Sequence, residues 1–449
     1  MSEELLDLAR RIVAEAGRRG ASAAECFIRQ GRELSVTVRK GEVESIKQSE
    51  GNALGIRVFR GRRAGITYSS DLGWPAVERM IGSALAIADT ASEDPFAGLP
   101  APEDQGMIEG ELQLYSPAPA AMTPEQAIDW AQRGERAALE CDPRLSNSDG
   151  GSFEAGEGNK ILVNSQGFAG AVRRSSCSIS VVPIASQDGK MQRDYWYSIA
   201  HSPELLESAE SVGRRAAERT LRRLGARKVP TARVPVIFDP QAARSLLGHL
   251  LEAVSGESVY REASFLAGQL GKPVAAPIVD LIDDGTRPAG FGTAPFDGEG
   301  VPTRRTPVIS AGRLESYLLN SYAARKLGLQ TTGNAARALA GNPGVSCGNF
   351  TLAPGSQSPE QIVSSVKQGF YVTEFIGFGV NSVTGDYSRG ASGLWIDNGA
   401  LAYPVEEVTV AGNLKEMFRN IQVIGNDLEF RSAITAPTLL IEGLTIAGR

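Results

Sequence analysis

The sequence predicts an α+β protein, in which an N-terminal helix-plus-antiparallel-sheet region precedes a β-rich C-terminal domain of barrel or sandwich type. Fifty glycines, 24 prolines and 6% aromatic residues among 449 indicate many turns and short strands rather than long helical bundles. A helix followed by alternating, hairpin-like stretches occurs twice before residue 225. The rest of the chain is mostly typical of strands separated by turns. We expect three parts, at residues 1–95, 120–227 and 230–449.

The first part is expected to be a small α+β unit. Residues 3–19 predict a helix whose apolar positions share one face, namely Leu5, Leu8, Ile12 and Ala16. Period-two alternation then predicts strands with turn residues between them, at residues 25–28, 34–38 and 54–59. A helix over residues 75–91 closes the unit.

The second part begins with a helix-start signal. Before it, residues 92–121 are rich in Pro, Glu and Ala and predict an exposed linker. Thr123 is expected to cap the helix, Pro124 to occupy its first turn and Gln126 to complete a capping box. Further strands and one more helix start are predicted at residues 171–182, 194–199 and 202–204.

The third part is expected to open with a strand followed by a helix. Residues 234–238 resemble a strand, and Asp239-Pro240 starts a helix that carries Leu246, Leu247 and Leu250. Strand-like segments then continue to residue 446, interrupted by a helix near residues 360–369. Such spacing favours a β-rich domain.

Charge and targeting signals exclude several classes of function. A net charge of −6 and a pI near 5.4 argue against direct nucleic-acid binding, which normally uses a basic face. No apolar run approaches the roughly 20 residues that span a membrane, and the acidic N-terminus lacks the order of a secretion signal. The scattered cysteines form no CxxC pair and are expected to be reduced. We therefore expect a soluble, cytoplasmic protein without membrane contact.

Two glycine-rich motifs lack the residues that their chemistry needs. Gly344–Gly348 fits the G-x-S-x-G form of a serine-hydrolase elbow, but no histidine follows residue 249 to act as base. Gly290-Phe291-Gly292 has Pro295 where dinucleotide binding would need a third glycine. We interpret the first motif as a turn and expect no nucleotide cofactor.

A group of acidic residues between positions 280 and 299 could contact a peptide or an ion. Carboxylates at this density can bind a hard cation or act as acid and base. The alternative is a set of turns in which aspartates bond nearby backbone amides. We favour turns, because no EF-hand spacing is present. The residues are Asp280, Asp283, Asp284, Asp297 and Glu299.

Histidine is scarce in this chain, which contains only His201 and His249. A zinc site normally takes three protein ligands and leaves one position open for water. His249 precedes Glu252 by three residues on the predicted helix, so the two share a face. A zinc helix needs two histidines, and a lone one on a Leu-rich helix is more often a packed or capping residue. His249 stays a candidate contact for a peptide or an ion, and His201 is expected in a loop.

A series of short segments carries a family resemblance over residues 244–449. In order they are Gly256–Arg261, Ala263–Leu266, Leu270–Lys272, Asp283–Thr286, Phe296–Val301, Leu318–Asn320, Ala324–Gly328, Thr332–Asn334, Ile424–Asp427 and Leu444–Gly448. In these segments the chain resembles the TldD/PmbA family, and most closely its PmbA (TldE) branch. The N-terminal half is compatible with the family but carries a weaker signature.

The resemblance implies a site that has lost its metal ligands. The TldD branch is similar to a zinc metallopeptidase with an HExxxH helix and a cysteine near the C-terminus. Here Leu251 and Gly256 stand at the two histidine positions, Glu252 keeps the general-base carboxylate, and no cysteine follows residue 427. The resemblance therefore implies no catalytic residue, no metal and no cofactor in this chain, with zinc expected in a TldD-like partner.

The hypothesis that follows is a non-catalytic subunit of a heteromeric zinc metalloprotease that acts on extended or unfolded peptides. Its partners would be a TldD-like catalytic subunit and an extended peptide, which a β-rich domain could hold by strand addition. Assembly with further copies of itself stays open. One alternative is a self-sufficient metallopeptidase whose metal is held by carboxylates between Asp283 and Glu299. Another is a regulator of DNA gyrase, a label given to this family.

Overall fold

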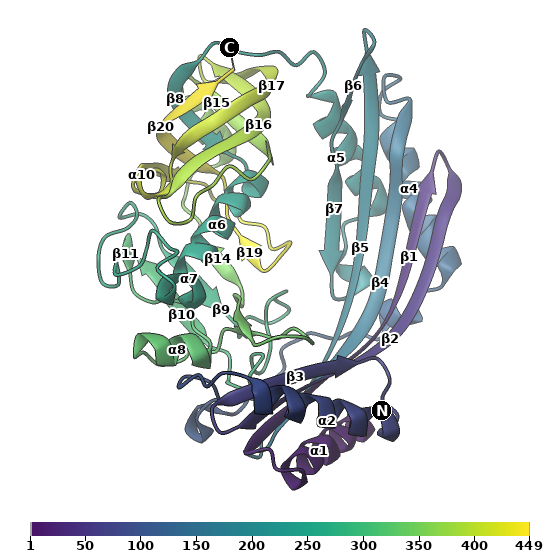
Figure 1. The fold of residues 1–449 in the computed structure, drawn as a ribbon. Coiled ribbons are helices and arrows are strands. Elements are labelled where there is room, and N and C mark those ends of the chain that lie inside the picture. The colour runs from purple at the N-terminus through teal and green to yellow at the C-terminus, as the bar shows by residue number, and fades with distance from the viewer. Residues whose placement is uncertain (1, 449) are drawn as a thin grey trace.

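Two bodies lie side by side in the computed structural model, which describes residues 2–448 (Figure 1). One is a long twisted sheet with helices on one face, and the other is built around a small barrel. The expected α+β class is therefore confirmed, including the N-terminal antiparallel sheet and the barrel form of the C-terminal domain.

A seven-stranded antiparallel sheet combines strands from both halves of the first 227 residues. Its order is β3-β2-β1-β4-β5-β6, and β7 also pairs with β5. The four central strands have 17 to 19 residues each, which corresponds to a length of about 60 Å. The strands are β1 (Ala23–Arg39), β2 (Glu42–Arg60), β3 (Arg63–Ser69), β4 (Asn147–Asn164), β5 (Ala169–Gln187), β6 (Lys190–Arg193) and β7 (Trp196–Ala200).

Helices cover one face of this sheet and leave the other for the C-terminal body. The helical segments are α1 (Ser2–Arg18), α2 (Trp74–Thr90), η1 (Pro102–Asp104), α3 (Ala118–Ala121), α4 (Pro124–Leu139), η2 (Pro203–Leu205) and α5 (Ala209–Leu221). Helices α1 and α2 pack on one end of the sheet around Ile28, and α4 and α5 pack on the other around Val36. Because strand residues alternate between faces, Phe27 points the opposite way, where it packs with Phe296 of the C-terminal body.

Local signals located some elements correctly and others not. The capping box of Thr123 and Gln126 is confirmed at the start of α4. The helix predicted at residues 202–204 is only the short η2, and the longer α5 begins at Ala209 with Ser208 as its cap. The exposed linker predicted over residues 92–121 is only partly correct, because most of the segment is exposed or partly exposed but Leu99 and Leu114 are buried. Arg325 fixes this segment by donating hydrogen bonds to three of its backbone carbonyls.

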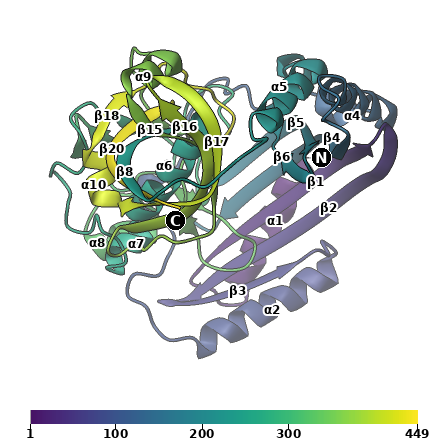
Figure 2. The ribbon, with the colours of Figure 1, turned by 90° about the horizontal axis from the view of Figure 1, so that it is seen from above.

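The C-terminal body contains a closed five-stranded barrel. Its strands follow the order β17-β16-β15-β8-β20, and pairing between β17 and β20 closes the circle, visible from above in Figure 2. β18 pairs with β20 outside the circle. The strands are β8 (Ala232–Phe238), β15 (Gln368–Ile376), β16 (Asp386–Asp397), β17 (Ala400–Asn413), β18 (Ile421–Ile424) and β20 (Leu439–Ala447).

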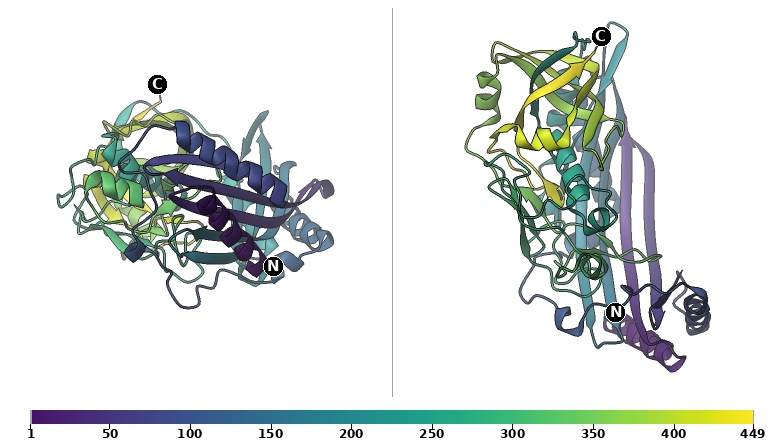
Figure 3. Two further views of the ribbon diagram at one scale, coloured as in Figure 1. Left: turned by 60° about the horizontal axis from the view of Figure 1, so that its bottom comes forward. Right: turned by 60° about the vertical axis from the view of Figure 1, so that its left-hand side comes forward.

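Shorter elements extend this body toward the long sheet, whose strands run past it along its whole length (Figure 3). A small sheet has the order β11-β10-β9-β14-β19, and β12 pairs with β13. Its strands are β9 (Leu281–Asp284), β10 (Arg305–Ser310), β11 (Arg313–Leu314), β12 (Ala335–Ala336), β13 (Gly344–Val345), β14 (Phe350–Leu352) and β19 (Ile434–Thr435). The helices are α6 (Pro240–Val254), α7 (Gly256–Tyr260), α8 (Ser321–Leu327), α9 (Pro359–Ser365) and α10 (Leu414–Arg419).

Candidate functional site

The helix that the resemblance aligns with a zinc-binding helix is α6, together with its continuation α7. Asp239 caps α6 by accepting a hydrogen bond from a backbone amide of the first turn. The helix then stops, Ser255 adopts an extended conformation, and α7 begins at Gly256. The two positions where the resemblance places histidines, Leu251 and Gly256, therefore lie on either side of a break.

Gly256 is buried at a point where a side chain does not fit. A Cβ atom there would lie 2.9 Å from Ala323 Cβ and 3.2 Å from the Leu318 carbonyl oxygen, and closer still to the Leu319 side chain. The Gly256 amide also donates a 2.8 Å hydrogen bond to that Leu318 carbonyl, which fixes the close approach. Leu251 packs against the main apolar core. The residues present therefore do not fit a zinc ion, and within residues 2–448 no three His, Cys, Asp or Glu side chains form a metal-ligating group.

His249 and Glu252 do not join the acidic residues in one site. The Glu252 side chain is exposed. The His249 ring is half-buried and packs edge-on against Tyr387, with 6.0 Å between ring centroids. Burial, followed by the charge of Arg389, lowers the pKa of His249 below its ordinary value, so the ring is neutral at pH 7. Neither residue lines the cavity that contains Asp283.

Four of the acidic side chains accept hydrogen bonds from the backbone around them, and the first is Asp280, which accepts from the Ala311 amide at 2.7 Å. Asp284 accepts hydrogen bonds from the amide and hydroxyl of Thr286. Asp297 accepts from three backbone amides, at distances of 2.8, 3.0 and 2.9 Å. Glu299 accepts from the Ser321 amide at 2.9 Å. These carboxylates therefore hold loops in place, and their oxygens do not converge on a common point in a metal-ligating group.

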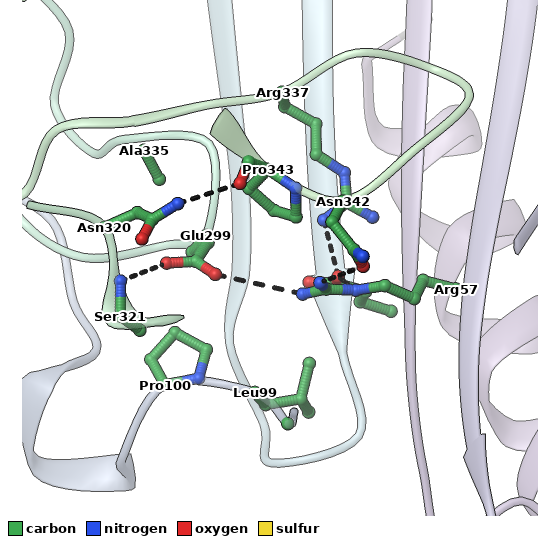
Figure 4. Close-up of polar contacts among 12 residues, drawn as sticks. Arg57, Leu99, Pro100, Glu299, Asn320, Ser321, Ala335, Arg337, Asn342 and Pro343 are labelled. Atoms are coloured by element: carbon green, nitrogen blue, oxygen red, sulfur yellow. Dashed lines mark hydrogen bonds and ion pairs between the residues drawn. The ribbon is translucent and has the colours of Figure 1, made fainter. Parts of the chain in front are cut away.

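A buried ion network connects the long sheet to the loops of the C-terminal body (Figure 4). Glu25 of β1 accepts hydrogen bonds from Arg57 of β2 and from Arg337, which follows β12. Glu299 lies 3.9 Å from Arg57, and all four side chains are at most 5% exposed. Burial opposes the ionisation of Glu25, but the charges of Arg337 and Arg57 outweigh it and lower the pKa of this carboxyl.

Next to this network, a cavity of about 380 Å³ lies between the sheet and the loops. Phe27 and Leu162 line it from the sheet, and Asp283 and Cys347 line it from the C-terminal body. Burial raises the pKa of the Cys347 thiol to about 12, so this cysteine is not a thiolate at neutral pH. The motif Gly344–Gly348 thus consists of the short strand β13 and the residues Ser346, Cys347 and Gly348, which line the cavity.

Asp283 is the remaining acidic residue of the group, and its carboxyl group contacts Asn334 and the backbone at Gly348. One carboxylate oxygen, Oδ2, accepts a 2.7 Å hydrogen bond from Asn334 Nδ2. The other oxygen is buried without a hydrogen bond of normal geometry. Burial, reinforced by the charge of Asp284, raises the pKa of Asp283 to about 6.

We expect this shift to make stability depend on pH. Since an unfolded Asp loses its proton near pH 4, the folded chain binds more protons than the unfolded one between about pH 4 and pH 6. The free energy of unfolding therefore falls over that window, by about 2–3 kcal/mol in total. Asp283→Asn removes the contribution of this carboxyl group to the pH dependence of the free energy of unfolding. The urea midpoint of the variant should therefore rise relative to that of the parent as the pH increases from about 4 to about 6. Asp284→Asn is the control, and an identical pH profile for Asp283→Asn and the parent would contradict the assignment.

Sequence reasoning missed the Glu25–Arg57–Arg337 network and the basic residues of the cavity, Lys160 and Arg174. The sequence does contain one signal for the ion network. Glu25 directly precedes the apolar run Cys26-Phe27-Ile28, and a buried strand tolerates a charged residue only if that charge is paired. The partner could not be identified, because Arg337 is 312 residues away along the chain.

Comparisons with known proteins match this architecture part by part. Family models described as PmbA/TldA metallopeptidase domain 1, central domain and C-terminal domain match residues 24–88, 117–224 and 231–448. Metalloprotease PmbA of Escherichia coli O157:H7 is 41% identical, over 96% of this chain and 93% of the relative. A metalloprotease PmbA homologue of Haemophilus influenzae is 34% identical, over 99% of this chain and 97% of the relative. A metalloprotease TldD homologue of that organism is 22% identical, over 96% of this chain and 94% of the relative.

Solved structures share the whole fold. A protein from Bacteroides thetaiotaomicron, named as a candidate modulator of DNA gyrase, has a TM-score of 0.92 and 26% identity, covering 99% of this chain and 98% of that one. TldE of Thermococcus kodakarensis has the same fold, with a TM-score of 0.87 at 20% identity over 98% and 100%. The long sheet and the closed barrel are thus the architecture of the PmbA/TldA metallopeptidase domains that match this chain. The chain belongs to the PmbA/TldD family. Among residues 2–448, no helix is long and apolar enough to cross a membrane.

Proposed function

We propose that this chain is the non-catalytic, PmbA/TldE-type subunit of a cytoplasmic, heteromeric zinc metalloprotease that acts on extended or unfolded peptides. The observation that carries the proposal is the packing at Gly256, where the family resemblance places a metal-ligating histidine. That position is closed by Leu318, Leu319 and Ala323, and Leu251 offers only a hydrocarbon side chain at the other one. Glu252 alone has no metal-bound water to activate.

The catalytic zinc would belong to a TldD-like partner. A TldD homologue aligns with this chain over nearly its whole length, which supports two related subunits of the same architecture. The space between the long sheet and the C-terminal loops would contribute to the enclosure that admits an extended chain. The carboxylates between Asp283 and Glu299 do not support a separate metal site, because Asp297 and Glu299 are engaged by backbone amides.

The first test is the zinc content of the tag-free chain purified alone, measured by elemental mass spectrometry. We expect a zinc content near zero per chain and no chelator-sensitive peptidase activity, because no ligand set is present. A stoichiometric zinc content with chelator-sensitive hydrolysis would contradict the proposal and favour a self-sufficient metallopeptidase.

The second test is assembly with a TldD-like chain from the same genome. Co-expression should yield a stable complex in which peptidase activity against an unfolded protein depends on the histidines of the TldD-like chain. Glu252→Gln in the present chain should leave that activity unchanged, since the Glu252 carboxylate holds no metal-bound water. A chain that assembles only with itself, or a complex whose activity requires Glu252, would overturn the assigned role.

A further inference from the structure

Three basic side chains form a cluster on the face of the long sheet that is turned toward the C-terminal body. Arg29 of β1 and Lys160 of β4 are direct cross-strand partners, so their Cβ atoms are about 5 Å apart. Arg174 of β5 lies diagonally next to Lys160, because it pairs with Gly158 two residues away. All three share the face of Phe27 and Leu162, since strand residues two apart point to the same side.

Among the described residues, no carboxylate forms an ion pair with this cluster. Within residues 2–448, no ion pair or hydrogen bond involves the side chains of Arg29 and Lys160, and Arg174 donates one hydrogen bond, to the Phe291 carbonyl at 3.0 Å. The Arg174 Nε atom is buried without a partner. The Lys160 side chain is exposed to solvent inside the cavity, and the cavity walls shield part of it from bulk water. This desolvation, followed by the charges of Arg174 and Arg29, lowers the pKa of Lys160 to about 8.

Like charges placed directly opposite each other destabilise a sheet. The native fold therefore holds a repulsive arrangement that an anion would relieve. Space for an anion exists, because Arg29, Lys160 and Arg174 together line a cavity of about 450 Å³, and Lys160 and Arg174 also line the 380 Å³ cavity described above. Glycines border the cluster on the same sheet face, and a Cβ at Gly51 would meet no atom within 4 Å.

We propose that Arg29, Lys160 and Arg174 form a carboxylate-binding site that holds an acidic residue or the C-terminal carboxylate of an extended peptide in the space between the two bodies. This inference rests on the proposed function, which supplies the extended peptide. It adds that the present subunit selects for negative charge on that peptide. Arginine and lysine donors to a carboxylate make charge-assisted hydrogen bonds, which are stronger than neutral ones.

The surroundings favour a peptide carboxylate over a nucleic-acid backbone. Acidic side chains line the same two cavities: Glu33, Glu157, Asp283 and Asp297. Glu157 is already paired with Arg32 and Arg173, but Glu33 is exposed on the same face and strand, about 13 Å from Arg29. A continuous polyanion running along the sheet would meet this charge, whereas a peptide with isolated carboxylates would not. The chain as a whole carries a net charge of −6.

The test is a binding measurement on the full chain by fluorescence anisotropy. Its probes are three short peptides with an uncharged dye: one with alternating glutamates and an amidated C-terminus, one with glutamine replacing glutamate, and the glutamine peptide with a free C-terminal carboxylate. We expect one of the two carboxylate-bearing peptides to bind at least about tenfold more tightly than the amidated glutamine peptide. Which of them does so distinguishes a side-chain site from a C-terminal one.

Substitutions within the cluster should abolish that preference. Arg29→Gln, Lys160→Met and Arg174→Gln are each expected to weaken binding of the preferred peptide by about tenfold. Lys367→Met removes an exposed lysine elsewhere and should have no effect. Lys160→Met should also raise the melting temperature of the free chain, because it removes repulsion from the sheet, and this shift shows that the variant is folded.

Three results would overturn the proposal: equal affinity for all three peptides, cluster variants that bind as Lys367→Met does, or tighter binding of single-stranded DNA with the same loss in the variants. The last would make the cluster a phosphate site. A chain that assembles with its TldD-like partner and lacks zinc, but shows no carboxylate preference, would refute this inference and leave the proposed function standing.

Discussion

Replacing Gly256 with histidine is expected to destabilise the chain by more than about 3 kcal/mol and to yield no zinc site. The new Cβ would overlap the Leu319 side chain and lie 2.9 Å from Ala323 Cβ. Overpacking by a few atoms costs about 1–3 kcal/mol in a well-packed core, and an imidazole adds a polar ring that would be buried without an assured partner. Gly256→Ala should lose about 1–3 kcal/mol for the Cβ alone.

Gly248, on the adjoining α6 helix, provides a matched control. A Cβ at Gly248 would meet nothing within 4 Å, so Gly248→Ala should gain up to about 1 kcal/mol from the higher helix propensity of alanine. Gly248→His should differ little from the parent. Urea denaturation followed by circular dichroism gives all four values. If Gly256→His were as stable as Gly248→His and bound zinc, the position would have room for a ligand. The absence of zinc binding in the parent would then come from missing ligand residues and not from packing.

Two of the helix starts were predictable from the sequence because their signals are local. Thr123, Pro124 and Gln126 lie within four consecutive residues, and Asp239 precedes Pro240 directly. Both caps form hydrogen bonds within one turn, so no information about the remainder of the chain is needed. The failure at Ser202 has the same origin: Ser202-Pro203-Glu204 has the local form of a helix start but opens only the short η2, and Ser208, which precedes Ala209-Glu210, is the residue that caps α5.

Pairings between distant parts of the chain could not be predicted in this way. β1 pairs with β4, so that Cys26 lies opposite Val163, and the barrel closes only when β17 pairs with β20. Alternation identifies the face of each strand but not its neighbour. The same limit hid the proposed carboxylate-binding cluster, because Arg29, Lys160 and Arg174 lie on three different strands and only the pairing of β1, β4 and β5 brings them together on one face. Conversely, the acidic residues between 280 and 299 looked like one cluster, but Asp280, Asp284, Asp297 and Glu299 each accept hydrogen bonds from different backbone amides.

Glu25 is the second position at which a single change is expected to have a large effect. Glu25→Gln should lower the free energy of unfolding by about 3–5 kcal/mol, since breaking a buried pair leaves an uncompensated charge. Its carboxylate accepts hydrogen bonds from both Arg57 and Arg337. After the substitution, Glu299 at 3.9 Å from Arg57 would be the one acidic group of the network left facing two buried guanidinium groups.

The loss should be concentrated where the two bodies meet, because Arg337 belongs to the C-terminal body and Glu25 to the sheet. We therefore expect faster tryptic cleavage after Arg337 in Glu25→Gln, measured together with the urea midpoint. Glu33→Gln on the same strand and face is the control, and its exposed side chain should contribute within about 0.5 kcal/mol. Adding Arg337→Gln to Glu25→Gln should restore part of the loss, because Arg57 and Glu299 then remain as a balanced pair. If the double variant had a lower free energy of unfolding than Glu25→Gln, charge imbalance would not explain the instability of Glu25→Gln.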